Sequence, residues 1–307
     1  MELIRGLSGA HRLAGGCVLT IGTYDGIHLG HQALLARLYE HAVGRPAAAV
    51  LMTFEPTPRE YLAPDDPPAR LTSLRERWRI LSGTRLHYLW LLRFGEALRN
   101  LPGEAFAQLL ARELRPRVVV VGHDFRFGRN GEATAAVLAA AGTRLGFDVD
   151  VLGPVTLEGE RISSSGVRAA LARGDFERAR RWLGRPWSMR GRVMQGKRLG
   201  RDLGFPTANL PLERRRAPVA GIFAVRVHGV ASAALPGVAS LGTRPTIGGV
   251  EALLEAHLFD FSGELYGREI EVEFAAKLRD EASFPTLEAL TAQMRRDAAD
   301  ARRILNG

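Results

Sequence analysis

The first half of the chain alternates continuous apolar runs with segments of helical spacing, and no other feature limits its fold as strongly. The clearest run is Val118–Gly122, a β-branched series that a glycine closes. Other apolar runs lie at Cys17–Ile21, Ala47–Phe54, Tyr88–Phe94 and Phe147–Val151. Strands that are apolar along their whole length are buried on both faces, so the pattern predicts a parallel sheet covered by helices.

Four segments between or after these runs have the periodicity of helices, and a change of pattern follows the last one. They are Leu74–Leu81, Phe106–Leu114, Ala133–Leu145 and Phe176–Leu183. The sequence Gly-Arg-Pro at 184–186 ends the last helix, because glycine and proline both stop helices. We therefore expect a domain over residues 1–184 and a second over 185–307.

The second half has short strands of alternating polarity, which predict an antiparallel β-barrel. The expected strands are Met189–Met194, Gly221–Val227, Ala231–Leu235, Gly237–Gly242, Glu255–Phe261 and Glu269–Phe274. A closing helix has Thr286 as its expected cap. Its expected apolar face consists of Leu287, Leu290, Met294, Ala298, Ala301 and Leu305. The predicted class is thus α/β followed by β.

The segment Gly22–His31 joins the first apolar run to the helical spacing of residues 32–38. Gly22 and Gly30 allow close approach of a ligand, and a helix start attracts anions such as phosphate. His28 and His31 would add two donors to phosphate oxygens. Two alternatives remain open: a structural turn, and a zinc site, which would need further ligands although the only cysteine, Cys17, lies inside a strand.

The net charge of +9 comes from the middle of the chain. The stretch from Arg168 to Arg216 holds fourteen lysines and arginines against four acids. Such a segment suits nucleic acid or phosphorylated small molecules, and the lack of an aromatic RNA-binding signature favours a nucleotide. One cysteine, no signal-peptide core and no membrane-length apolar run make a cytoplasmic protein the expectation.

Two further segments of the first domain are candidates for ligand contact. The loop Gly122–Gly131 alternates aromatic and charged residues, which fits either a ligand wall or aromatic rings tucked into the core. The segment Ile162–Arg168 places a serine run before a helix, which offers capping hydroxyls and open N–H groups. An ordinary cap followed by a solvated arginine is the alternative.

The second domain has a basic glycine turn followed by two neutral oxygen ligands. Gly196, Lys197 and Arg201 fit phosphate binding, although a β-hairpin turn explains the same pattern. Thr207 and Asn209 are ligands that Mg²⁺ accepts beside nucleotide phosphates.

Glu255 and His257 alternate on a predicted strand, so both point to one face. A glutamate that faces the inside of a small barrel fits a general base. An ion pair with one of the many arginines is the alternative.

Together these motifs resemble the bifunctional bacterial riboflavin kinase/FMN adenylyltransferase (FAD synthetase) family, and their order is the specific part. The similar motifs are Gly22–His31, Val121–Gly128, Ile162–Ser165, Leu203–Leu210, Gly242–Thr246 and Leu265–Gly267. The resemblance implies a Rossmann-like nucleotidyltransferase domain and a C-terminal riboflavin-kinase-like barrel. Riboflavin, FMN and ATP would be the partners, with Mg²⁺ as cofactor, no nucleic acid or membrane partner, and a chain compatible with a monomer.

The resemblance also assigns roles. In the barrel, Thr207 and Asn209 hold Mg²⁺-ATP and Glu255 takes the proton of the riboflavin 5′-hydroxyl. In the first domain, ATP is held and adenylyl transfer is promoted by Gly22, Asp25, His28, Gly30, His31, Ser163, Ser164 and Arg168. Phe54, Asp124 and Phe125 would contact the flavin. Tyr24, Thr57, Gly166, Lys197 and Phe223 depart from the common family pattern.

Two readings from other classes stay open beside this one. The first is a flavin- or nucleotide-binding regulator without turnover, and the second is a nucleic-acid-binding protein that uses the basic middle segment. Another His-x-Gly-His nucleotidyltransferase is an alternative within enzymes; an aminoacyl-tRNA synthetase would need a lysine-rich second signature, and residues 1–184 contain no lysine.

Overall fold

The computed structural model describes residues 1–6, 15–44, 47–195, 204–212, 214, 216–246 and 249–306. The chain divides into two compact units, each built from two stretches. The first unit comprises Met1–Pro68 and Arg77–Ser163, and the second comprises Ala69–Glu76 and Ser164–Gly307. The predicted domain boundary between residues 184 and 185 remains a prediction.

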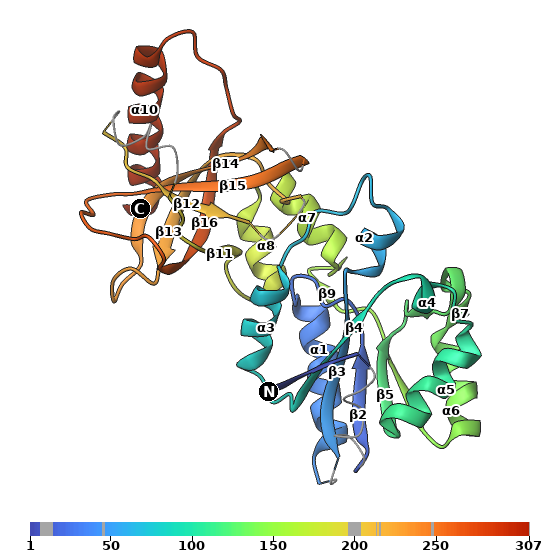
Figure 1. Cartoon of the computed structure of the whole chain (residues 1–307). Coiled ribbons are helices and arrows are strands. Elements are labelled where there is room, and N and C mark those ends of the chain that lie inside the picture. The colour runs from blue at the N-terminus through green and yellow to red at the C-terminus, as the bar shows by residue number, and fades with distance from the viewer. Residues whose placement is uncertain are drawn as a thin grey trace. The chain divides into compact units, whose positions relative to one another are not determined.

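The first unit is built on a parallel sheet of six strands, as the apolar runs predict (Figure 1). The strands are β1 (Glu2–Arg5), β2 (Cys17–Ile21), β3 (Ala48–Glu55), β4 (Tyr88–Arg93), β5 (Pro116–Gly122) and β8 (Asp148–Leu152). Their order across the sheet is β1-β4-β3-β2-β5-β8, and every neighbouring pair is parallel. The edge strand β1 does not follow from the apolar runs, because it has only four residues and begins and ends with a charged residue, Glu2 and Arg5.

Four helices cover the two faces of this sheet. Helices α1 (Leu29–Ala42) and α3 (Leu74–Ser82) contribute to one apolar core, and α5 (Gly103–Leu114) and α6 (Ala135–Leu145) contribute to the other. Successive residues of a strand point to opposite faces. In β5, accordingly, Val118 and Val120 belong to the first core, and Val119 and Val121 belong to the second.

The chain reverses its direction of travel across the sheet between β2 and β5. After β2 it builds β3 and β4 on one side, and it then returns to place β5 on the other side of β2. Ligands of open parallel sheets bind beyond the strand ends at such a switch point. The segment Gly22–His31 follows β2 and the loop after Gly122 follows β5, so both candidate loops start at this point.

Short elements complete the first unit. They are α2 (Pro58–Leu62), α4 (Glu96–Arg99), the 3₁₀ turn η2 (Arg129–Gly131), and the paired strands β6 (Arg126–Phe127) with β7 (Ala133–Thr134) and β9 (Thr156–Leu157) with β10 (Glu160–Arg161).

The second unit contains a six-stranded antiparallel sheet that curls into a nearly closed barrel (Figure 1). The strands are β11 (Ser188–Arg192), β12 (Ala208–Pro211), β13 (Gly221–His228), β14 (Leu235–Thr246), β15 (Gly249–Leu258) and β16 (Glu269–Arg279). Their order is β11-β16-β13-β14-β15-β12. A bridge between Met194 and Asn209 links the end of the first edge strand to the other edge.

The predicted separate strand at Ala231–Leu235 is wrong. Residues 229–233 form bends between β13 and β14, and β14 is one strand from Leu235 to Thr246. The small side chains of residues 231–233 are exposed, so burial of side chains does not favour a strand in this segment.

The closing helix is α10 (Leu287–Asn306), and the hydroxyl of Thr286 accepts the N–H of Ala289 at 3.2 Å, which confirms the cap. Ala298, Ala301 and Leu305 pack in a cluster with barrel residues, as predicted. Leu287 was expected on the same face but is 55% exposed. It stands in the first turn, where the helix has only begun.

Helices α7 (Ser164–Ala172) and α8 (Phe176–Leu183) pack against each other in the second unit. A side chain at Gly166 would overlap the ring of Trp182, which is itself buried. The departure from the family pattern at Gly166 thus has a local reason: the indole of α8 fills the space that a larger residue would need.

The stretch Ala69–Glu76 comes early in the chain yet packs within the second unit through a buried ion pair. Both carboxylate oxygens of Glu76 accept from Arg214 at 2.7 and 2.6 Å. The side chains of Glu76 and Arg214 are 8% and 1% exposed. The indole of Trp187 also donates to the carbonyl of Leu71 at 3.1 Å. This arrangement was not predicted from the sequence.

We expect Arg214→Ala to destabilise the second unit by about 3–5 kcal/mol, because it leaves the Glu76 carboxylate buried without its cation. Denaturant unfolding followed by tryptophan fluorescence measures the change. The matched control is Arg303→Ala, which breaks an exposed pair with Asp300 on α10 and should change stability by less than about 0.5 kcal/mol. Equal effects of the two substitutions would contradict the importance of the buried pair.

Among the helices that the structure describes, none combines the length and apolar character needed to cross a membrane.

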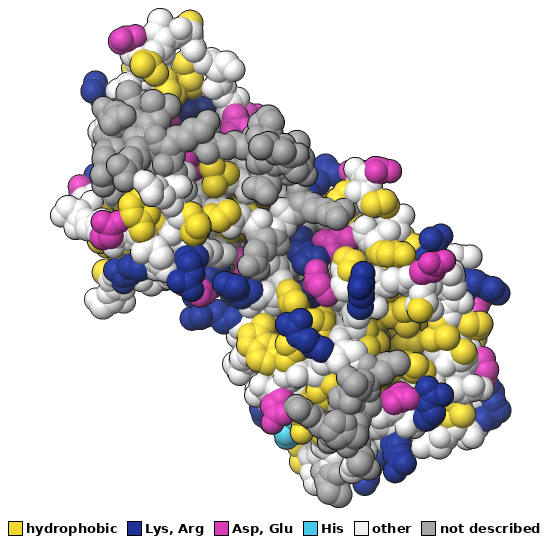
Figure 2. Space-filling view, in the orientation of Figure 1, with side chains coloured by type: hydrophobic (Ala, Val, Ile, Leu, Met, Phe, Trp, Pro, Cys, Tyr) yellow, Lys and Arg dark blue, Asp and Glu magenta, His cyan; other side chains and the backbone are white. Residues whose placement is uncertain are grey.

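On the face drawn in Figure 2, basic and acidic side chains are interspersed.

Candidate functional site

The turn after β2 forms a compact cradle at the start of α1. Tyr24 and Ile27 both adopt left-handed backbone conformations, with φ of 50° and 44°, and Gly26 lies between them at 84°. Such conformations are uncommon for non-glycine residues and persist only where the surroundings hold them. The turn ends at His28, which is the N-cap of α1.

The helix cap determines how His28 carries its proton. Nδ1 of His28 accepts the backbone N–H of His31 at 3.4 Å. An accepting ring nitrogen bears no proton, so a neutral His28 must carry its proton on Nε2. The two imidazoles stack with their centroids 3.8 Å apart and their planes inclined by 17°. The predicted pair of histidines is therefore assembled by the cap itself.

His31 stays neutral at physiological pH. Burial of the ring, the neighbouring His28 and the cation of Arg77 together hold the pKa of His31 well below its ordinary value of 6.5. Its Nδ1 is buried and has no hydrogen-bond partner among the residues that the structure describes. A neutral imidazole can donate one hydrogen bond without adding a charge to the site.

Tyr24, which departs from the family pattern, completes the stack. Its ring packs on His31 with a centroid distance of 4.6 Å. Its hydroxyl shares a 2.7 Å hydrogen bond with the hydroxyl of Thr20, which satisfies the additional polar group in the core. Burial raises the pKa of the Tyr24 phenol, so the residue remains neutral.

The glycines of the turn leave room for these rings. A methyl group on Gly30 would lie 3.1 Å from two atoms of the His28 ring, and one on Gly22 would lie 3.1 Å from the Tyr24 ring. Asp25 is buried within the same turn, at 5% exposure.

We expect Gly30→Ala to lower, by about tenfold or more, the conversion of FMN to FAD that the family resemblance implies, because the methyl group would displace the His28 ring, which the resemblance assigns to that reaction, and small misplacements of reacting groups are costly. The chain should remain folded, since alanine favours helices over glycine. Gly95→Ala is the matched control, because open space surrounds that position. Chromatographic assay of FAD measures both variants, and unchanged activity of the Gly30 variant would show that the His28 ring tolerates the methyl group.

The zinc alternative for this turn gains no support in the residues that the structure describes, where no group of three His, Cys, Asp or Glu side chains could hold a metal ion. The thiol of Cys17 donates to the carbonyl of Leu114 at 3.6 Å inside the core. Burial raises the pKa of Cys17 to about 12, which disfavours the thiolate that zinc requires.

Arg77 is a residue of this region that the sequence did not single out. Its guanidinium donates to the carbonyl of Thr23 at 2.7 Å and to Glu55 at 2.7 Å. The residue is 1% exposed. In the sequence it stands in an amphipathic helix, where an arginine is ordinarily solvated, so no local signal identifies it.

The loop after β5 was expected either to line a ligand site or to place its aromatic rings in the core. Phe127 is buried in the core, and Phe125 packs partly buried against it, with ring centroids 5.5 Å apart. Asp124 is exposed and forms an ion pair with Arg161. Phe54, in β3, also belongs to the core cluster and meets Phe94 edge to face at 6.0 Å.

Thr57 is engaged in local structure. Its hydroxyl accepts the N–H of Glu60, and the Glu60 carboxylate accepts the N–H of Thr57, which makes a capping box for α2. Where the family pattern has a longer side chain, this chain therefore has a residue that caps α2.

The returning serine segment divides between the two units. Ser163 ends the first unit, and Ser164 starts α7 in the second. In the first unit, the carbonyl of Ile162 lies 3.7 Å from the position of a Cβ on Gly30, so the chain returns to the start of α1. Within the second unit, Nε of Arg168 donates to the carbonyl of Ala69 at 2.6 Å.

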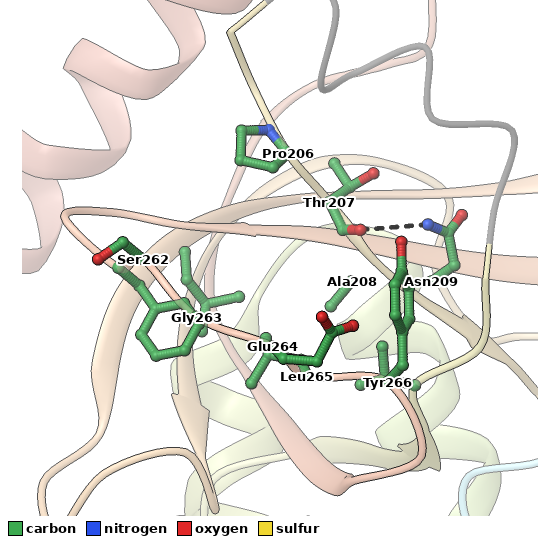
Figure 3. Close-up of a pocket in the computed structure, with 12 residues that line it drawn as sticks. Pro206, Thr207, Ala208, Asn209, Ser262, Gly263, Glu264, Leu265 and Tyr266 are labelled. Carbon is green, nitrogen blue, oxygen red and sulfur yellow. Dashed lines mark hydrogen bonds between the residues drawn. The ribbon is translucent and has the colours of Figure 1, made fainter.

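The barrel has a pocket beside its predicted nucleotide ligands. Its volume is about 410 Å³, and Thr207, Asn209, Glu264 and Tyr266 are among its lining residues. In Figure 3 the Glu264 carboxylate and the Tyr266 hydroxyl point toward the side of the pocket that Thr207 and Asn209 form. Glu264 was not predicted, because an exposed acid in a loop carries no pattern.

Asn209 is held in a way that suits a ligand. Its Nδ2 donates to the carbonyl of Thr207 at 3.2 Å. Its Oδ1 is buried and has no hydrogen-bond partner in the part of the chain that the structure describes. A buried carbonyl oxygen without a partner is unfavourable unless something binds it. The oxygen donors of Thr207 and Asn209 fit the preference of Mg²⁺.

Glu255 lies opposite Asn209 in the register of β12 and β15, and opposite Ser240 in the register of β14. Directly opposed residues on antiparallel strands have side chains on the same face, about 5 Å apart at Cβ. The expected inward orientation of Glu255 is wrong: Leu254 and Ala256 are fully buried, so they occupy the apolar inside of the barrel and Glu255 lies on the other face.

His257 shares the alternation of Glu255 but is occupied by local contacts. Its Nδ1 lies 2.9 Å from the carbonyl of Pro206, and its ring meets Phe205 at 5.1 Å. It thus fastens the strand to the segment that leads into Thr207. Phe223, which replaces a common tyrosine, is fully buried among aromatic rings of the barrel core, where a hydroxyl would need a partner.

The predicted phosphate-binding residues Gly196, Lys197 and Arg201 lie outside the described residues.

Comparison with known protein families assigns both halves of the chain. The family described as FAD synthetase matches residues 11–166, and the family described as Riboflavin kinase matches residues 183–305. Their order along the chain is the order of the two compact sites described above.

Relatives match over nearly the whole chain. A Bifunctional riboflavin kinase/FMN adenylyltransferase of Escherichia coli K12 is 45% identical, with 98% of this chain and 97% of the relative covered. One of Haemophilus influenzae is 40% identical over the full length of both chains. A crystal structure of a protein named Macrolide-efflux Protein, from Streptococcus pneumoniae, superposes with a TM-score of 0.81 at 29% identity, with 98% and 99% of the chains covered. The chain belongs to the bifunctional riboflavin kinase/FMN adenylyltransferase family.

Proposed function

We propose that the two activities of this enzyme are carried by two separate sets of side chains. The enzyme phosphorylates riboflavin to FMN and then transfers the adenylyl group of ATP to FMN, which gives FAD and pyrophosphate. The observation that carries the residue assignment is the joint cap and stack of His28 and His31 at the switch point of the sheet. Glu255, Thr207 and Asn209 form the other set.

In riboflavin phosphorylation, Glu255 accepts the proton of the 5′-hydroxyl as that oxygen attacks the γ-phosphorus of ATP, and ADP leaves as the bond from that phosphorus to the bridging oxygen breaks. Its register opposite Asn209 supports this role, because the base must lie close to the phosphates that Asn209 helps to hold. The pocket beside Thr207 would take ATP, with Glu264 and Tyr266 on its wall. Gly196, Lys197 and Arg201 would add contacts to the phosphates.

Thr207 and Asn209 are the residues that would hold Mg²⁺ with the nucleotide. The buried Oδ1 of Asn209 supports this, because it offers an oxygen with no competing partner among the described residues. A bound Mg²⁺ supplies charge neutralisation at the phosphate oxygens.

In adenylyl transfer, the FMN phosphate is the nucleophile and already carries negative charge, so no strong base is needed. His28 and His31 donate to the oxygens that gain charge at the α-phosphorus, and the tautomer fixed by the cap leaves Nε2 of His28 as a donor. Gly22, Asp25 and Gly30 shape the cradle for the nucleotide.

The returning segment would supply the remaining contacts for this reaction. Ser163, Ser164 and Arg168 complete the phosphate contacts in this proposal. Phe54, Asp124 and Phe125 would contact the flavin; the exposure of Asp124 and the partial burial of Phe125 are compatible with that role.

Incubation with riboflavin, ATP and Mg²⁺, followed by chromatography of flavins, tests whether the enzyme carries out both reactions. We expect riboflavin to disappear, FMN to form first and FAD to accumulate. The absence of both products would overturn it, and binding of flavins without turnover would favour a regulator.

Three remaining expectations belong to this proposal. The enzyme works in the cytoplasm, functions without a nucleic-acid partner, and is compatible with a monomer. Equal affinity for mixed-sequence DNA and for ATP, with strong salt dependence of the former, would contradict the second of these.

A further inference from the structure

We infer that Arg77 is a positioning residue for adenylyl transfer, which fixes the turn that carries the stack of Tyr24, His31 and His28. The inference rests on the proposed role of the two histidines. Arg77 belongs to α3, and the turn it contacts joins β2 to α1.

Arg77 donates hydrogen bonds to the turn after β2 and to the end of β3. Nη1 donates to the Thr23 carbonyl at 2.7 Å and to the Thr53 hydroxyl at 3.2 Å. That hydroxyl donates to the same Thr23 carbonyl at 3.3 Å. Nη2 donates to the Glu55 carboxylate at 2.7 Å. One carbonyl of the turn is therefore held by two donors, both anchored on rigid elements.

The ion pair between Arg77 and Glu55 requires desolvation of the guanidinium, which suggests a role other than stability. The Arg77 side chain is 2% exposed, whereas that of Glu55 is 29% exposed. A buried ion pair is often no more stabilising than apolar residues of the same size, because desolvation offsets the attraction. A planar guanidinium, in contrast, fixes several acceptors in one geometry.

The carbonyl that Arg77 holds stands directly before the strained part of the turn. The next residue, Tyr24, has φ of 50°, and its carbonyl accepts the N–H of Ile27 at 3.3 Å. Rotation of the Thr23–Tyr24 peptide would move the Tyr24 ring, on which His31 stacks at 4.6 Å. His31 in turn stacks on His28 at 3.8 Å. Thr23 thus connects the guanidinium to both imidazoles through contacts that are each present in the structure.

The test compares Arg77→Met, which keeps the length of the side chain without its charge and donors, with Arg77→Lys. The matched control is Arg79→Met, an exposed position two residues further along α3. For conversion of FMN to FAD, kcat and KM are measured for FMN and ATP. Conversion of riboflavin to FMN is measured on the same preparations as an internal reference.

We expect Arg77→Met to lower kcat for FAD formation about tenfold or more while both KM values change less than about threefold, because groups that act in the transition state are displaced. Arg77→Lys should recover a substantial part of kcat, since an ammonium can still reach the Thr23 carbonyl. Formation of FMN and all constants of Arg79→Met should match the wild type.

Two results would overturn the inference: an unchanged kcat in Arg77→Met, or a rise of KM alone. If Arg77→Met does not fold, Thr53→Val takes its place, because it removes the hydroxyl that Arg77 and Thr23 share; it should lower the same kcat about threefold, and no change would count against the inference. A wild-type enzyme that makes FMN but no FAD would instead overturn the proposed function of the histidines.

Discussion

Glu255→Gln is expected to abolish FMN formation from riboflavin and to leave conversion of FMN to FAD intact. General bases contribute about 10²–10⁴-fold to rates, so the first activity should fall at least a hundredfold. Glutamine keeps the size and one acceptor oxygen of the side chain but cannot accept the hydroxyl proton. Supplying either riboflavin or FMN with ATP, and following the products by chromatography, separates the two effects.

Glu273→Gln is the matched control for this experiment. Glu273 alternates on β16 with the fully buried Val272 and the largely buried Phe274, and it is bonded to His228 at 2.9 Å. It should retain both activities. Loss of FAD formation from FMN in a folded Glu255 variant would contradict the separation of the two sites, and residual FMN formation near the wild-type rate would exclude Glu255 as the base.

His31→Ala should produce the opposite pattern, in which FMN accumulates and FAD does not form. Loss of one donor to a developing charge lowers kcat about 10²–10³-fold. Riboflavin kinase activity should be unchanged, because the residues proposed for it lie in the barrel. Time courses from riboflavin show the accumulation directly.

His41→Ala serves as the control for folding of the same helix. His41 lies in α1 and contacts Asp150 at 2.5 Å, outside the cradle. A His31 variant that forms FAD at the wild-type rate would remove His31 from the site. Because the pKa of His31 is lowered below 6.5, the wild-type rate of FAD formation should not change with protonation of this ring between pH 7 and 8.

The parallel sheet and the first candidate turn could be predicted because their signals are local. The valine run of β5 is buried on both faces, and a continuous β-branched run of this kind is typical of a central strand in a parallel sheet. The turn after β2 carries glycines and histidines within ten residues, so sequence proximity already implies spatial proximity.

Contacts between distant segments could not be predicted. Arg77, Glu76 and Arg214 are polar residues that ordinarily face solvent, and only the tertiary structure brings their partners to them. No local signal near Tyr24 points to the guanidinium of Arg77, more than fifty positions later, which donates to the carbonyl of Thr23.

The errors in the barrel have a related cause. Alternation identifies two faces of a strand, but it does not say which face is inside, and the assignment of Glu255 depended on that choice. Leu254 and Ala256 decide it, because apolar side chains fill the interior of a small barrel first.

The second compact unit includes eight residues, Ala69–Glu76, that precede its barrel by more than a hundred positions. A fragment cut at residue 184, where the sequence pattern changes, would keep Arg214 and lose Glu76. The guanidinium of Arg214 would also lose its acceptors at the carbonyls of Arg70 and Leu71. A barrel fragment that retains this ion pair therefore needs residues 69–76 as well as the residues after 184.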